Sequence, residues 1–296
     1  MEASRDASIP LKLQYIRAYA EGDDFTEANF QHEQVPFDLE PKCVALVLVD
    51  VWNLGFGQRP LIPEVGFFGE YNGGKSFPAR ANEITLDKIK PALDAARDAG
   101  LTVVHLPSEA IARRYLQCQA TLNPDDLEVA SDNAEIFGRA ERRREWPPED
   151  FVRDWNQQRL DRTRDNHWLA AYARVKQVMD IADAVKPDDT DLVVATGEQM
   201  HRLLKDRGVY VLVYCGFAAN WCLMDRPGAL RDMAARGYGC ILLRDATAAI
   251  EHSETFDRQL NAKAVVDQVE LRFGYSALTD DFIRACKLHR GRSSKK

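Results

Sequence analysis

The sequence predicts an α/β fold in which a doubly wound, mostly parallel sheet carries helices on both faces. Two patterns predict it. Short valine-rich apolar runs, typical of strands buried on both faces, alternate with segments that have apolar residues at helical spacing. Several of these helical segments end at a glycine, a common stop signal. A chain of 296 residues can bury such a core without disulfide bonds.

The first unit of this pattern lies between residues 43 and 107. CVALVLVDV (43–51) predicts a buried strand, and LDKIKPALDAARDAG (86–100) predicts a helix that ends at Gly100. LTVVHLP (101–107) predicts the next strand. A strand, a helix and a second strand in this order form a βαβ unit, so we expect the two strands to be parallel.

The second half of the chain repeats the alternation. It predicts strands at 191–196, 209–216 and 238–247, and helices at 197–208, 219–237 and 252–274. Together with the first unit, these segments predict a sheet of five or six parallel strands.

Other segments fall outside this pattern. We expect residues 1–40 to form an N-terminal arm and residues 291–296 to form a flexible tail. A single domain is expected over 41–290, with a lid-like loop at 54–82, rich in glycine, proline and aromatic residues, and a large insertion at 108–180.

Composition and charge restrict the partners. The chain has 39 Lys and Arg against 46 Asp and Glu, a net charge of -7, which argues against nucleic acid as a partner. RAERRRE (139–145) leaves two interpretations open, a solvated surface or subunit interface and an RNA contact, and its acidic flanks favour the first.

Localisation is predicted from what the sequence contains. The longest apolar run, Val44–Val49, is too short to cross a bilayer, and the N-terminus has no apolar secretory segment. Six cysteines without a CxxC pair indicate free thiols rather than a disulfide framework. We therefore expect a cytoplasmic protein with no membrane partner.

Cys222 is the most informative candidate for chemistry. It follows a predicted strand and a GFAAN connection, and it begins a predicted helix at the edge of the sheet where ligands bind. A thiol there is expected to have a lowered pKa, and free amides of the turn can hold an oxyanion. Asp50, at the end of the neighbouring strand, is placed to take the thiol proton. The alternative is that Cys222 is a small buried apolar residue.

The remaining cysteines lie in no comparable setting. We assign all of them to packing: Cys43, Cys118, Cys215, Cys240 and Cys286.

VALVLVDVWN (44–53), paired with VLVYCGFAANWCLMDRPGALRDMAARGYGCILLRDATAA (211–249), resembles the isochorismatase-like cysteine hydrolases. That family includes nicotinamidases, N-carbamoylsarcosine amidohydrolases and isochorismatases. The resemblance covers about 40–107 and 187–275, and it implies a Rossmann-like three-layer α/β/α sandwich, a small-molecule substrate and a homo-oligomer.

The amidohydrolases of this family use an Asp–Lys–Cys triad, and the resemblance maps its acid to Asp50 and its nucleophile to Cys222. It also implies a non-proline cis peptide bond at Phe217–Ala218. The oxyanion donors would then be the amides of Ala218 or Ala219 together with that of Cys222.

The lysine of the triad has no clear counterpart. Its position reads as Ala195 or Thr196, because DLVVAT runs almost directly into the next predicted helix. Lys186 precedes that strand and does not align there. Lys75, in the GGKSF segment, is a possible substitute from another direction.

Aromatic residues gather around the two motifs. They are Trp52, Phe56, Phe67, Phe68, Tyr71, Phe217 and Trp221. They either pack in the core or an oligomer interface, or line a pocket for a flat substrate, with Trp52 and Trp221 the candidates to contact it. Asn53 either orients a substrate amide or stabilises a turn, and Asp245 is expected to cap a helix or turn.

We predict no catalytic metal and no cofactor. Nicotinamidases of the family use an Asp-x-His group with another histidine, and this sequence has no Asp-x-His. His105, His201 and His252 are isolated from one another in the sequence.

The sequence thus predicts a cysteine-dependent hydrolase of a small-molecule amide or ureido C–N bond that acts through a thioester. One alternative is a catalytically silent member that binds a small molecule or acts as a scaffold, since the family lysine is missing. A second is an isochorismatase-type hydrolase of vinyl ethers.

Overall fold

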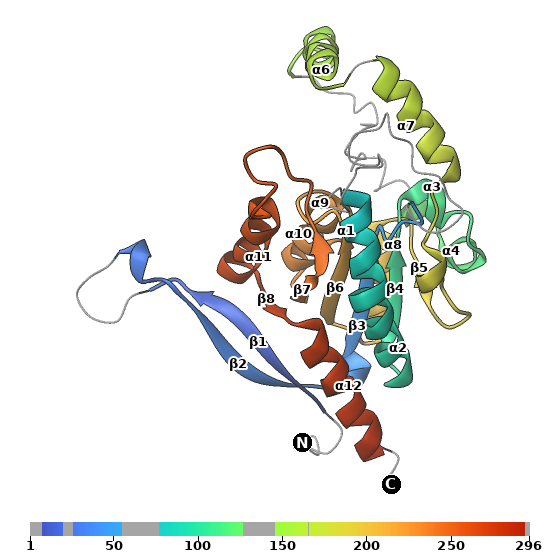
Figure 1. Ribbon diagram of the computed structural model, residues 1–296. Coiled ribbons are helices and arrows are strands. Elements are labelled where there is room, and N and C mark those ends of the chain that lie inside the picture. The colour runs from blue at the N-terminus through green and yellow to red at the C-terminus, as the bar shows by residue number, and fades with distance from the viewer. Residues whose placement is uncertain (1–7, 20–25, 55–76, 127–145, 165, 294–296) are drawn as a thin grey trace.

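The computed structural model describes residues 8–19, 26–54, 77–126, 146–164 and 166–293 of the chain. Within them, one sheet has the strand order β2-β1-β8-β7-β6-β3-β4-β5 (Figure 1). The strands are β1 (Ile9–Arg17), β2 (Gln31–Leu39), β3 (Val44–Val49), β4 (Thr102–Leu106), β5 (Leu192–Val193), β6 (Val211–Phe217), β7 (Gly239–Ala248) and β8 (Gly274–Ala277).

The part of the sheet from β8 to β5 is parallel throughout, as the sequence predicts. β3 lies at its centre, where Val47 pairs with Val104 of β4 on one side and with Tyr214 of β6 on the other. All residues of β3 are buried. This explains the continuous apolar run of its sequence, because a central strand has no solvent-facing side.

The chain forms helices that cover both faces of the sheet, together with α6 (Glu149–Thr163) and α7 (Asn166–Val178), which lie beyond its end (Figure 1). The other helices of the described residues are α1 (Phe77–Ile84), α2 (Lys90–Asp98), α3 (Glu109–Ala112), α4 (Leu116–Thr121), α8 (Gly197–Asp206), α9 (Cys222–Asp225), α10 (Leu230–Ala235), α11 (Leu260–Arg272) and α12 (Thr279–Ser293). Short 3₁₀ helices lie at Glu27–Asn29, Pro41–Cys43 and Asp183–Val185.

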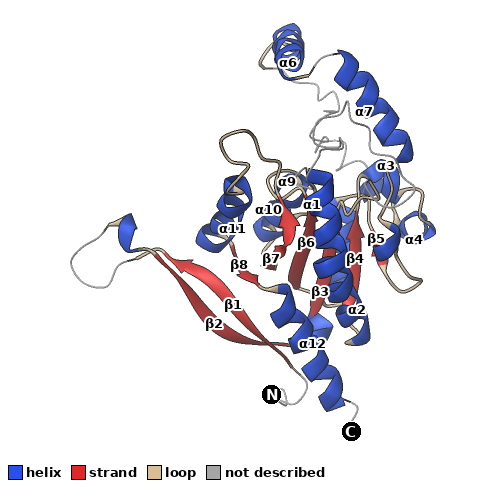
Figure 2. Cartoon of the chain, in the orientation of Figure 1, coloured by secondary structure: helices blue, strands red, loops and turns tan. Residues whose placement is uncertain are grey.

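Alternate residues of β3 pack against different helices. Leu46 and Leu48 share a core with α2 and α12, whereas Val47 and Val49 share a second core with α8, α10 and α11. The fold is therefore the predicted three-layer α/β/α sandwich (Figure 2).

The helix predicted at 86–100 begins earlier than expected. α1 starts at Phe77 and continues through a π-helical turn, Thr85–Ile89, into α2. Residues 77–82 of the expected lid-like loop are thus helical, and residues 55–76 of that loop lie outside the described residues. The helix predicted at 252–274 begins later, at Leu260.

The helix predicted at 219–237 is broken into α9 and α10. Pro227 restricts the residue before it to extended conformations, and Arg226 has φ -66° and ψ 145°. Gly228 has φ +85°, and its N–H donates to Oδ2 of Asp232 at 2.7 Å. The buried hydroxyl of Tyr214 donates to the carbonyl of Gly228 at 2.8 Å. The chain therefore makes a fixed turn between two short helices.

The N-terminal arm contains a hairpin of β1 and β2 that extends away from the body of the protein (Figure 1). β1 joins the sheet antiparallel to β8, through Gln14 and Ser276. Leu11 and Leu13 are buried and the residue between them is exposed, so β1 shows the alternation of a strand with one buried face.

The insertion at 108–180 contributes α3, α4, α6 and α7. α6 has no buried residue, whereas α7 buries Ala171 and Val175. The RAERRRE segment lies outside the described residues. At the C-terminus, α12 continues to Ser293, three residues into the segment expected to be a flexible tail. No helix in the described part of the chain combines the length and apolar character needed to span a membrane.

Candidate active site

Asp50 follows β3 at the carboxyl edge of the sheet. Its backbone is left-handed, with φ +45°, and the residue is 1% exposed. The end of β6 lies very close to it, since a Cβ on Gly216 would come within 2.0 Å of the carbonyl oxygen of Val49. Glycine at 216 thus allows β6 to bring the turn at 217–222 next to Asp50.

Cys222 begins α9 at the end of that turn and is 7% exposed. The amides of Trp221 and Leu223 both donate to the carbonyl of Ala218, at 3.0 and 3.2 Å, which fixes the backbone around the thiol. The Phe217–Ala218 peptide bond is cis, as predicted.

Arg226 connects the two candidate residues, and the sequence analysis did not identify it. Its Nη2 atom lies 2.5 Å from Oδ2 of Asp50 and 3.4 Å from Sγ of Cys222. The Asp50 side chain is fully buried and that of Arg226 is 18% exposed. One guanidinium nitrogen therefore contacts both a carboxylate and a thiol at the edge of the sheet.

The resting thiol is protonated at neutral pH. Burial and, after it, the charge and hydrogen bonding of Asp50 raise the pKa of Cys222, Arg226 acts in the opposite direction, and the net result is a pKa of about 12. This direction is opposite to the one expected from the helix start. The physical reason is that α9 is only four residues long, so desolvation outweighs any helix dipole.

The structure distinguishes between the expected oxyanion donors. The amide of Ala219 donates to the carbonyl of Ala248 at 2.8 Å, so it is already engaged. The amides of Ala218 and Cys222 make no hydrogen bond to another described residue. They remain available to an oxyanion near Sγ.

Asn53 is committed to the protein itself. Its side chain donates to the carbonyl of Val178 at 3.2 Å and accepts from the amide of Asp180 at 3.0 Å, so it anchors the end of the insertion. The turn-stabilising alternative therefore describes it better than contact with a substrate amide.

Aromatic rings flank this edge of the sheet. Phe77 of α1 lies 6.3 Å from Trp52 and 6.0 Å from Phe217 between ring centroids. Trp221 is half-buried and packs against the core. The other predicted members of the cluster, at positions 56, 67, 68 and 71, lie outside the described residues.

No lysine stands where the family pattern would place one. The Thr196 hydroxyl instead caps α8 by accepting from the amide of Gln199 at 3.0 Å, and the amide of Ala195 donates to the Gln199 side chain at 2.7 Å. Lys186 pairs with Asp180 at 2.6 Å. Lys75 lies outside the described residues.

The histidines serve other contacts. Nε2 of His105 lies 2.9 Å from Asp191, Nδ1 of His201 lies 2.9 Å from the Tyr238 hydroxyl, and His252 is exposed. Among the described residues, no three His, Cys, Asp or Glu side chains are grouped to hold a metal ion.

Asp245 caps α12 as expected, because its Oδ1 accepts from the amide and the hydroxyl of Thr279 at 2.8 and 2.7 Å.

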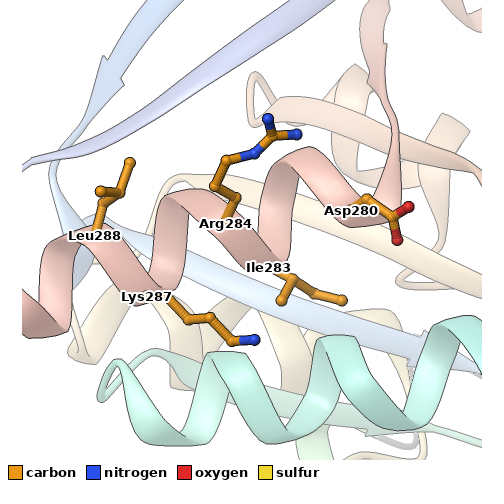
Figure 3. Close-up of a pocket in the computed structure, with 5 residues that line it drawn as sticks. All are labelled: Asp280, Ile283, Arg284, Lys287 and Leu288. Carbon is orange, nitrogen blue, oxygen red and sulfur yellow. The ribbon is translucent and has the colours of Figure 1, made fainter.

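A separate surface pocket lies beside α12. Figure 3 shows its lining residues, all from that helix: Asp280, Ile283, Arg284, Lys287 and Leu288. It contains none of the candidate catalytic residues, so we do not assign the chemistry to it.

Comparisons with known proteins show which family the chain is similar to. A family model described as the isochorismatase domain matches residues 45–270. Ureidoacrylate amidohydrolase RutB of Azorhizobium caulinodans is 33% identical over 84% of this chain and 93% of its own length. The same enzyme of Agrobacterium fabrum is 26% identical over 83% and 91%. A solved cysteine hydrolase from Pseudomonas syringae pv. phaseolicola is 17% identical and covers 85% of this chain and 95% of its own, with a TM-score of 0.48.

Proposed function

The chain belongs to the isochorismatase family and is an isochorismatase-like hydrolase, and from this premise we propose that it cleaves a C–N bond of a small ureido or amide compound with Cys222 as nucleophile. The observation that carries the proposal is the shared position of Asp50 and Cys222, because both are buried at one edge of the sheet and contact the same nitrogen of Arg226. The relatives named ureidoacrylate amidohydrolase favour a working hydrolase over a silent scaffold.

The first step begins from a protonated thiol. Sγ of Cys222 attacks the carbonyl carbon while Asp50 takes the thiol proton, so a C–S bond forms and the carbonyl π pair moves to oxygen. The amides of Ala218 and Cys222 hold that oxyanion. When the C=O bond reforms, the C–N bond breaks and Asp50 returns its proton to the leaving nitrogen.

The second step releases the enzyme. An amide substrate leaves a thioester on Cys222 and a ureido substrate leaves a thiocarbamate. Asp50 takes a proton from water as the water oxygen attacks the acyl carbon. The C–S bond then breaks, and the proton on Asp50 goes to the sulfur.

The proposal is tested by turnover with a panel of ureido and amide compounds, ureidoacrylate first, because that substrate is in the name of the relatives. Cys222→Ser should lower kcat by roughly three orders of magnitude or more, since it removes the nucleophile. Asp50→Asn should lower it by roughly two to four orders, since it removes the base. Trapped acyl-enzyme should add mass at Cys222 in the wild type.

Cys43→Ser is the matched control. Cys43 is also buried and free, but it lies at the opposite end of β3, next to Glu40, and should keep wild-type turnover. Full activity in Cys222→Ser would rule out the cysteine mechanism. A folded wild type that turns over no member of the panel would support the silent alternative.

We also propose that the protein is a cytoplasmic homo-oligomer. All six cysteines are free, which suits a reducing compartment. The hairpin arm extends away from the body (Figure 1). Tyr19 and Phe30, 59% and 36% exposed, lie just beyond the last strand pair of the hairpin, Arg17 with Gln31, where a second copy would cover them.

A further inference from the structure

We propose that Arg226 is a catalytic residue that takes the place of the triad lysine, as a permanent cation that stabilises the thiolate form of Cys222 and orients Asp50. This inference rests on the proposed cysteine mechanism. It gives the site a cation that never exchanges its proton, since a guanidinium stays charged throughout the working pH range. Asp50 is then the base of the reaction, and Arg226 only holds charge.

The contacts of Arg226 select it for this role. One nitrogen, Nη2, lies within hydrogen-bonding distance of both the acid and the nucleophilic sulfur. The Asp50 carboxylate is fully buried, so a cation beside it interacts far more strongly than on the surface. Removal of the cation from such a pair leaves a buried charge without compensation.

The turn that follows α9 fixes the position of the guanidinium. The amide of Arg226 donates to the carbonyl of Cys222 at 3.1 Å, which ties the cation to the nucleophile through the backbone. Pro227 prevents the helix from continuing, and Asp232 and Tyr214 hold Gly228 on the other side. Arg226 is therefore held on both sides, as a preorganised catalytic group must be.

The segment after β5, where the family pattern would place the lysine, explains why the cation comes from the turn after Cys222 instead. Thr196 caps α8 directly after β5, so the chain has no loop there from which a lysine could extend. The nearby Lys186 is paired with Asp180 and Tyr115 instead. The charge that stabilises the sulfur is supplied from the Cys222 flank of the site.

The test is the rate of iodoacetamide alkylation of Cys222, followed by mass spectrometry from about pH 6 to pH 10, which needs no substrate and reports the thiolate fraction. Arg226→Met should lower the rate at about pH 8 by about tenfold or more, the equivalent of one pKa unit. Arg226→Lys should restore part of it, and the restored part should fade as the ammonium deprotonates near about pH 10.

Arg231→Gln is the matched control. Arg231 lies just beyond the turn, is half-exposed and pairs with Asp225 at 3.2 Å. The substitution therefore removes one positive charge, as Arg226→Met does, but changes no group that contacts the thiol. The alkylation rate of this variant should equal that of the wild type.

A second comparison covers the case in which Arg226→Met does not fold. Asp50→Asn with Arg226→Met removes both buried charges and leaves none uncompensated. Asp50→Asn alone should alkylate faster than wild type, because Asp50 raises the thiol pKa. The double variant should be about tenfold slower than Asp50→Asn, again about one pKa unit.

Equal rates in wild type and Arg226→Met, or in Asp50→Asn and the double variant, would overturn the role of Arg226. The cysteine mechanism would survive that result, because it is judged by the turnover of Cys222→Ser. Retained turnover in Cys222→Ser would instead overturn the mechanism, whatever the alkylation rates are.

Discussion

At Asp50, the backbone and the side chain both carry an energetic cost. The left-handed backbone at φ +45° costs of order 1 kcal/mol, less for Asp than for most residues, and the buried carboxylate is tolerated because a guanidinium contacts it. Such a combination persists when the surroundings enforce it. Asn keeps the shape and suits the same backbone, so Asp50→Asn removes the charge with little disturbance.

A second buried carboxylate, Asp191, contributes to stability rather than to the site. Burial alone would raise its pKa, but hydrogen bonds from His105 and Arg97 outweigh burial and hold the pKa at about 2. Because the folded pKa lies below the value of about 3.9 that is usual for aspartate, the contribution is fully present above that pH and is lost as pH falls through about 2.

Asp191→Asn should therefore lower the free energy of unfolding at about pH 7 by roughly 2 kcal/mol. The difference from wild type should shrink progressively below about pH 4, as the wild-type carboxylate becomes protonated. Urea unfolding at a series of pH values measures it. Asp98→Asn, at an exposed ion pair with Arg290, should change little at any pH. A pH-independent loss at Asp191 would contradict this assignment.

The strand patterns predicted that Asp50 and the turn before Cys222 lie at the ends of neighbouring parallel strands, which the structure shows, and the family resemblance implied the cis peptide bond at Phe217–Ala218. The sequence analysis missed Arg226 for two reasons. The missing cation was sought as a lysine after another strand, and 219–237 was expected to be one helix. Pro227 inside that run was the available signal, since proline interrupts a helix and fixes the residue before it.

Among the elements, the turn between α9 and α10 connects stability with chemistry. Gly228 has φ +85°, and an added Cβ would lie 3.1 Å from Sδ of Met200 and 3.3 Å from a methyl carbon of Leu106. Both neighbours belong to the core under the turn. A side chain at 228 therefore strains the backbone and displaces the core together.

Gly228→Ala should destabilise the protein by more than the roughly 1–2 kcal/mol expected of a left-handed backbone alone. It should also slow alkylation of Cys222, because the turn sets the position of Arg226. Gly237→Ala is the control, since Gly237 has φ +91° but nothing within 4 Å of its added Cβ. Denaturant unfolding of the two variants gives the comparison, and an equal or smaller loss at Gly228 would refute the packing argument.

Elements with buried, repetitive patterns were predicted well, and those set by tertiary contacts were not. The valine-rich runs gave β3, β4 and β6, but β8 is only four residues long and carries no strand pattern of its own. β1 does have a strand pattern, the alternation of apolar and polar residues in IPLKLQYIR, but residues 1–40 were predicted only as an arm, without a strand. A strand was predicted over 191–196, but β5 is only two residues long, because Thr196 already serves as the N-cap of α8.

At the scale of the whole molecule, the hairpin arm exposes aromatic rings that no other part of the described chain covers. Its root is held by Ser276, Gln14 and Glu270, whereas its outer part exposes aromatic rings. Exposed aromatic surface at the end of an extended strand pair is a contact that a second subunit would bury.

Light scattering after size exclusion should therefore give a mass that is a multiple of the 33.5 kDa chain. Tyr19→Glu combined with Phe30→Glu should shift that mass toward a single chain, because each change places a charge in the contact. Tyr210→Glu, at an equally exposed ring elsewhere, should leave the mass unchanged. A wild type that elutes as a single chain would refute the proposed homo-oligomer.

Most groups of the proposed site lie in one continuous segment, residues 217–228, so they can be transferred to another protein, or change in evolution, together. This segment carries the proposed nucleophile, both proposed oxyanion amides and the proposed cation, while Asp50 directly follows β3. In the Asp–Lys–Cys arrangement that the family resemblance implies, the cation would instead follow a different strand. Here residues 217–228 include the proposed cation. If this segment replaced the corresponding segment of an enzyme with an Asp–Lys–Cys triad, it would bring its own positive charge, and the lysine of the recipient would no longer be needed.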